Sequence, residues 1–114
     1  MSDMQSRARD LGMKWTKCLE MLAWLYEEVL DGSMRRNVAG KKDGFSLTDG
    51  GSEIKVKELE ACGRRYSVSL VYAGKPVIQC AGIDLAGLVK GMVRTLAENM
   101  SAQAMSIFVE EDAQ

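Results

Sequence analysis

The chain has 114 residues, of which 46% are hydrophobic and 27% charged, and its net charge is −1. This length and composition predict one globular domain that can bury a core without metals or disulfides. No uncharged run approaches the roughly 18 to 20 apolar residues that cross a bilayer, and no signal peptide opens the chain, so we expect a cytoplasmic protein. Histidine is absent and the three cysteines include no CxxC pair, which disfavours metal sites and a disulfide framework.

The strongest pattern lies in residues 11–30, where apolar residues recur at spacings of three and four, as on one side of an α-helix. The middle of this segment carries one charge, Glu20, and a helix that is apolar nearly all round is covered on more than one side. We expect the helix to begin between Asp3 and Asp10 and to end at Asp31-Gly32. Its apolar stripe comprises Met4, Ala8, Leu11, Trp15, Cys18, Leu22, Leu25 and Val29.

A polar, basic stretch at residues 33–44 predicts a loop. Phe45–Leu47 then alternates like a short strand, and Asp49-Gly50-Gly51 is a turn of the hairpin type. A second strand over Glu53–Ala61 loses its alternation at Leu59. A bulge near Lys57-Glu58 would return the Leu59 side chain to the core face, because one extra residue restores the alternation.

The clearest strand is Tyr66–Tyr72, in which tyrosines and aliphatic residues alternate with serines. We expect turns on both sides of it, at residues 62–65 and at Ala73-Gly74-Lys75. Pro76 opens a last strand over Val77–Ala81, a position where proline removes no ladder hydrogen bond.

A second helix is predicted to follow Asp84, a good N-cap, with Ile83 and Leu88 as a hydrophobic staple across the cap. Residues 105–109 fit either a continued helix or a short strand, and residues 110–114 an acidic tail. The fold class is therefore α+β: a two-layer α-β-β-β(-β)-α domain whose antiparallel meander carries the N- and C-terminal helices on one face. We expect residues 1–114 to form this single domain, with 1–9 and 106–114 frayed.

Catalysis is not expected. Without histidine the commonest general base is missing, and no glycine loop before the second helix resembles a phosphate cradle. Glu27-Glu28 at the end of the first helix is interpreted as a solvated face. We therefore predict a non-enzymatic protein with no cofactor and no metal.

The outward side of the first helix is the leading candidate site. At 100° per residue, Met13, Lys17 and Trp24 lie roughly opposite the apolar stripe, with Met21 on the flank. Exposed tryptophan and methionine are typical of protein–protein interfaces. We predict partner binding through these four residues, with self-association into a homodimer as the simplest case. The alternative is that residues 33–44 or the C-terminal tail cover this face.

Gly87 and Gly91 lie four residues apart on one side of the second helix. Each glycine weakens a helix relative to alanine, so the close approach of another backbone would explain them. Packing against the first helix is the preferred interpretation, and a second interface is the alternative.

A second functional class is suggested by charge, because residues 35–75 carry nine Lys/Arg against five Asp/Glu while the flanking segments are acidic. Basic turns could bind the phosphates of nucleic acid. The predicted outer face of the sheet offers no aromatic platform for bases, and the pI near 5.5 also argues against this class. The candidate residues are Arg35, Arg36, Lys41, Lys42, Arg64, Arg65 and Lys75.

The order of a helix, three strands and a helix, with YSVSLVYAGKPVIQCAG running into the last helix, resembles that of the double-stranded-RNA-binding domain over Tyr66–Met100. That family contacts phosphates through a lysine-rich start of its last helix, whereas Asp84-Leu85-Ala86-Gly87 stands here. The residues that would carry the activity are absent, so the resemblance is one of element order and the family is not assigned.

Overall fold

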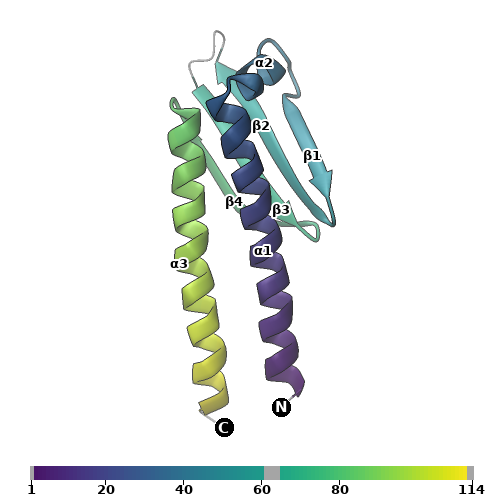
Figure 1. Cartoon of the computed structure of the whole chain (residues 1–114), viewed down its shortest axis with the longest axis vertical. Helices are drawn as coiled ribbons and strands as arrows, with labels where there is room; N and C mark the ends of the chain where they lie inside the picture. The colour runs from purple at the N-terminus through teal and green to yellow at the C-terminus, as the bar shows by residue number, and fades with distance from the viewer. Residues whose placement is uncertain (1, 61–64, 113–114) are drawn as a thin grey trace.

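The computed structural model describes residues 2–60 and 65–112, as three helices and four strands (Figure 1). One long helix precedes the sheet and another follows it, with a short helix between the first long helix and the first strand. In chain order the elements are α1 (Ser2–Leu30), α2 (Ser33–Val38), β1 (Phe45–Asp49), β2 (Ser52–Glu60), β3 (Arg65–Tyr72), β4 (Lys75–Gly82) and α3 (Leu85–Asp112).

The four strands form an antiparallel sheet in the order β1-β2-β3-β4. Two tight turns set this meander, because both place consecutive residues in the left-handed region that a hairpin turn requires. Gly50 and Gly51 have φ of 57° and 86° between β1 and β2, and Ala73 and Gly74 have 52° and 78° between β3 and β4. The predicted α+β class and antiparallel meander are confirmed.

Both long helices lie on one face of the sheet and run antiparallel to each other (Figure 1). They continue past the lower end of the sheet toward the two termini, so the molecule is elongated, with extents of 55 × 23 × 21 Å. The radius of gyration is 16.2 Å, against about 13 Å for a compact domain of this length. The backbone is helical from Ser2 and as far as Asp112, including most of the terminal segments for which fraying was predicted.

The core lies between the helix pair and the sheet. Of the predicted apolar stripe of α1, Leu11 is half-buried and the residues from Trp15 to Val29 are buried, and β3 buries Tyr66, Val68 and Leu70 as its alternation predicted. The two central strands and the two long helices thus bury one continuous apolar layer, whose loss from water is the main stabilising term. Its fully buried members are Cys18, Leu22, Leu25, Met34, Val38, Ile54, Val56, Val68, Leu70, Leu85, Val89, Met92 and Leu96.

The predicted loop at residues 33–44 is wrong in its first half, which forms α2. This helix has six residues, too short for a periodic pattern to reveal it, and it is held by tertiary burial of Met34 and Val38. The segment 105–109, for which helix and strand were both open, is part of α3.

Two further expectations need correction. The register of β2 shifts between Glu58 and Glu60, which makes Leu59 itself the extra residue of the bulge, and Leu59 is 47% exposed instead of turned to the core. Asp84 directly precedes α3, and the backbone N–H of Leu88 donates to its carbonyl at 2.9 Å. Ile83, however, is 77% exposed, so the predicted staple buries little of it.

Candidate functional site

The predicted interaction face of α1 is largely covered by the β1–β2 hairpin. Met21 is buried in the core, so its expected exposure is wrong. Trp24 is half-buried and stacks on Phe45 of β1, with ring centroids 5.8 Å apart and an interplanar angle of 24°. α1 thus buries two adjoining sides, one against α3 and the other against the sheet.

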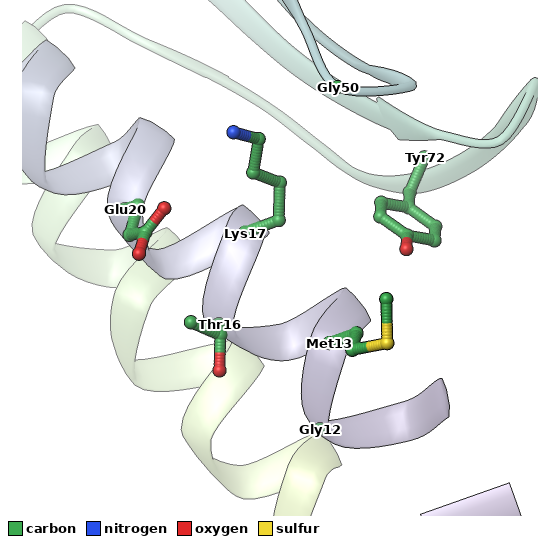
Figure 2. A pocket seen from close by; sticks show the side chains of 7 residues that line it. All are labelled: Gly12, Met13, Thr16, Lys17, Glu20, Gly50 and Tyr72. Carbon is green, nitrogen blue, oxygen red and sulfur yellow. The ribbon is translucent and has the colours of Figure 1, made fainter. Parts of the chain in front are cut away.

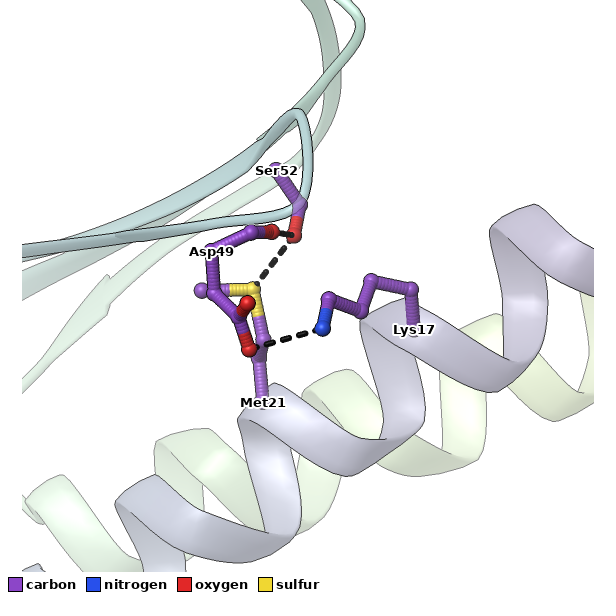
Figure 3. Close-up of polar contacts among 4 residues, drawn as sticks. All are labelled: Lys17, Met21, Asp49 and Ser52. Atoms are coloured by element: carbon purple, nitrogen blue, oxygen red, sulfur yellow. Dashed lines mark hydrogen bonds and ion pairs between the residues drawn. The ribbon is translucent and has the colours of Figure 1, made fainter.

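A cluster of polar contacts joins the turn of the β1–β2 hairpin to α1 (Figure 3). The ammonium of Lys17 donates to Asp49 Oδ2 at 2.7 Å, and the hydroxyl of the buried Ser52 lies 2.6 Å from the carbonyl oxygen of Asp49 and 2.8 Å from Met21 Sδ. Because a hydroxyl has one hydrogen and a thioether is a weak acceptor, Ser52 donates to the carbonyl and packs against the sulfur. Lys17 is therefore an anchoring residue as well as a surface cation.

The ion pair affects how Lys17 titrates. Its hydrogen bond to Asp49 raises the pKa of the ammonium above the ordinary value, burial lowers it, and the negative charges of Asp49 and Glu20 raise it further. The charged form of Lys17 is thus favoured in the folded protein.

Beside this cluster an open recess of about 480 Å³ remains between α1 and the lower end of the sheet. Met13 is 59% exposed there, and its side chain and the ring of Tyr72 point toward each other across the recess (Figure 2). The β1–β2 turn can approach Lys17 closely because position 50 is a glycine. A Cβ at Gly50 would lie 3.1 Å from Lys17 Cε. We call this the Met13 recess, lined by Gly12, Met13, Thr16, Lys17, Glu20, Gly50 and Tyr72.

Two of the four predicted partner-binding residues, Met13 and Lys17, line the Met13 recess. Tyr72 and Gly50 were missed because their place beside α1 depends on contacts more than 30 positions apart in the chain. The alternation of β3 assigned Tyr72 to the helix-facing side of the sheet, and the chain contains no local signal that this position reaches the rim.

Among the described residues, all but one of the candidates for the basic surface lie at one end of the sheet. Arg35 and Arg36 lie on α2, and Arg65 begins β3 at the same end, whereas Lys75 begins β4 beside the opposite turn (Figure 1). Eight residues of β3 separate the two ends, a span of about 26 Å. Lys41 and Lys42 are exposed in the segment that precedes β1, and Arg64 lies outside the described residues.

The described part of the chain contains neither a metal-ligating cluster nor an activated thiol at Cys18. Within residues 2–60 and 65–112 no group of three or more Cys, Asp or Glu side chains gathers where it could hold a metal ion. Burial raises the pKa of the Cys18 thiol, although the Lys14 ammonium acts in the opposite direction, which leaves this thiol a poor nucleophile. No described helix has the length and apolar character needed to cross a membrane.

Gly87 and Gly91 of α3 do not pack against α1, so the preferred interpretation of these two glycines as a helix–helix contact is wrong. Both are exposed; a Cβ at Gly91 would meet nothing within 4 Å, and one at Gly87 would first meet the side chain of Asp84. Each costs up to about 1 kcal/mol relative to alanine in a helix, and no packing contact among the described residues requires Gly91. They line an open groove of about 400 Å³, which we call the β4–α3 groove, together with Cys80, Gly82, Ile83, Asp84, Leu88 and Thr95.

Comparisons with models of protein families, with curated proteins and with solved structures find no match to this chain.

Proposed function

We propose that this chain is a small non-enzymatic protein–protein interaction module that binds a segment of another protein in the Met13 recess. The observation that carries the proposal is the exposure of Met13 opposite Tyr72. A methionine adapts its shape to different apolar partners, and tyrosine supplies a large rigid contact with a polar end.

The walls of the recess suit a side chain that arrives from outside. The Lys17–Asp49 pair and the contact between Ser52 and Met21 hold the hairpin against α1, so one wall is fixed before a partner binds. A preformed site loses less conformational entropy on binding. Glu20 lies exposed on the rim, which favours a partner segment with an apolar anchor followed by a basic residue.

The size of the surface supports a short segment over a second copy of this chain at α1. A standard interface buries about 800 Å² on each partner, whereas burial of Met21 and stacking of Trp24 leave the recess as the accessible part of the predicted face. The accessible part of the outward side of α1 therefore favours a short segment over self-association.

Site-specific photo-crosslinking tests the proposal. A photo-reactive residue at position 13, in the cells from which the sequence comes, is expected to give a defined adduct that the same residue at position 30 does not give. Leu30 is the matched control, because it is also an exposed apolar residue of α1, 63% exposed. The partner identified in this way is then titrated against the purified protein.

Met13→Lys is expected to weaken binding of that partner about tenfold or more, because it places a charge in the apolar part of the recess. Leu30→Lys should leave the affinity unchanged. Equal adducts from positions 13 and 30, or a partner that binds Met13→Lys as tightly as the wild type, would contradict the proposal.

Nucleic-acid binding by the basic turns has weaker support. One of its candidate cations, Lys75, lies at the opposite end of the sheet from Arg35, Arg36 and Arg65 (Figure 1), so the candidates do not all belong to one surface along which phosphates could be contacted.

A further inference from the structure

The strand β4 is an edge of the sheet, and nothing in the described part of the chain pairs with its outer side. Backbone N–H and C=O groups along such an edge form a template for another strand. From Ile78 to Gly82 the strand pairs regularly with β3 and contains no charged residue. The devices that usually protect an edge are confined to its start, where Lys75, Pro76 and a register shift at Val71 occur.

The helix beside this edge also leaves space. α3 packs against β4, since a Cβ at Gly82 would lie 3.2 Å from Leu88 Cδ2. On the open side of that contact, α3 presents Gly87 and Gly91 to the β4–α3 groove, and the exposed Ile83 and half-buried Leu88 complete its apolar lining. The other edge is different, because Trp24 and Lys17 of α1 contact β1 residues there.

We infer that β4 and the β4–α3 groove bind a second copy of this chain, with the two β4 strands antiparallel across a two-fold axis near Gln79. This pairing joins the two sheets into one of eight strands. It concerns a different surface from the Met13 recess and does not depend on the function proposed for that recess.

The charges at the ends of β4 favour a second copy. Lys75 begins the strand and Asp84 follows it, and both are exposed. When two such strands pair antiparallel about Gln79, Lys75 of one copy lies opposite Ile83 of its partner and beside Asp84 of its partner. The strand is thus self-complementary: its cationic end meets an anionic end, and its uncharged middle meets itself.

The glycines of α3 also fit this occupant. Paired strands lie about 4.8 Å apart, whereas helices with ordinary side chains lie about 8 to 10 Å apart. Because α3 packs on the edge strand itself, joining two β4 strands brings the two α3 helices close together, and small residues are then needed between them. Gly91 supplies such space, because a Cβ there would meet nothing within 4 Å, whereas Gly87 is already required within the chain, since a Cβ there would lie 2.6 Å from Asp84 Oδ2.

Solution mass by sedimentation equilibrium, measured over a range of concentrations, tests the inference. We expect the full chain to form a dimer. Gln79→Lys, which adds the charge that protects edge strands, is expected to raise the dimer dissociation constant about tenfold or more. The matched control is Thr48→Lys on β1, an exposed edge position opposite Glu53, and it should leave the dimer intact.

Gly91→Gln provides the second arm. In the monomer this change replaces an exposed glycine by a better helix former, so the thermal unfolding midpoint should not fall. In the dimer its side chain fills the space between the helices, and we expect about tenfold weaker association. Ala97→Gln, exposed and about 120° around α3 from Gly91, should have no effect on association.

Hydrogen exchange locates the interface. In the dimer, backbone amides of β4 should exchange more slowly than at concentrations below the dissociation constant, while amides of β1 should not change. A chain that remains monomeric at the highest concentration reached without precipitation would overturn the inference. So would a dimer that survives both Gln79→Lys and Gly91→Gln, or one that Met13→Lys dissociates instead.

Discussion

The two edges of the sheet differ in what the neighbouring helix presents to them. At β1, α1 contributes Trp24, which stacks on Phe45, and Lys17, which pairs with Asp49. At β4, α3 contributes Gly87 and Gly91, which contact no large apolar side chain. The same meander therefore has one edge joined to its helix by side-chain contacts, of which the Lys17–Asp49 pair is drawn in Figure 3, and one edge that borders the open β4–α3 groove.

This difference shows how a small two-layer domain can separate stability from association. Side chains that cross from α1 to the β1–β2 hairpin bury apolar area and hold the hairpin in place. Glycines on α3 contribute no such burial and weaken the helix that contains them. A sequence that keeps them leaves room for another chain there, which is the basis of the inferred β4 pairing.

The largest effect on the β1 edge is expected from Met21→Ala. Met21 is 3% exposed and packs against Ser52 at the start of β2, so the truncation should lower the free energy of unfolding by about 3 kcal/mol. Met13→Ala is the matched control and should change it by less than about 0.5 kcal/mol. Denaturant titration measures both, and equal losses from the two variants would show that the hairpin does not depend on Met21.

A smaller loss is expected from Trp24→Glu. The half-buried ring packs on Phe45, and replacing it by a carboxylate should cost about 2 kcal/mol of unfolding free energy. Trp24→Phe keeps an aromatic pair and should lose about half as much. If Trp24→Glu kept the stability of the wild type, Trp24 would be shown to lie on an exposed face, as the helical periodicity predicted.

The smallest expected effect is a pH-dependent difference in thermal midpoint between the wild type and Lys17→Met. Since the pKa of Lys17 is raised in the folded protein, its contribution to stability is fully present below its ordinary value of 10.5 and is lost as the pH rises through the folded pKa. The thermal midpoint of the wild type should therefore fall toward that of Lys17→Met above about pH 10.5. A constant difference between the two proteins at all pH values would show that the Lys17–Asp49 pair does not stabilise the hairpin.

Most elements could be predicted because their patterns are local. The spacing of apolar residues in α1, the alternation of Tyr66–Tyr72 and the glycines at 50 and 51 each act over a few neighbouring residues. The short α2 lacked such a pattern, since it is held by burial of Met34 and Val38. The bulge in β2 was predicted, but which residue it leaves unpaired depends on the register with β3.

The candidate site was harder to predict because it joins distant segments. Lys17 and Asp49 are 32 positions apart, and Met21 and Ser52 are 31 apart, so no local rule relates them. Periodicity placed Met21 beside the apolar stripe, but it could not show that a second layer covers that flank. Met13 stayed exposed because the recess opens where the sheet ends (Figure 2).

By itself the sequence determined two amphipathic helices, an antiparallel meander and their assembly into two layers, because each element has one apolar side that must be buried. Only the tertiary structure decided which flank of α1 the hairpin covers and that the glycines of α3 face open space beside β4. Helical and strand periods define the direction in which each side chain leaves its own element. Whether that side chain is exposed depends on which other elements pack on that side.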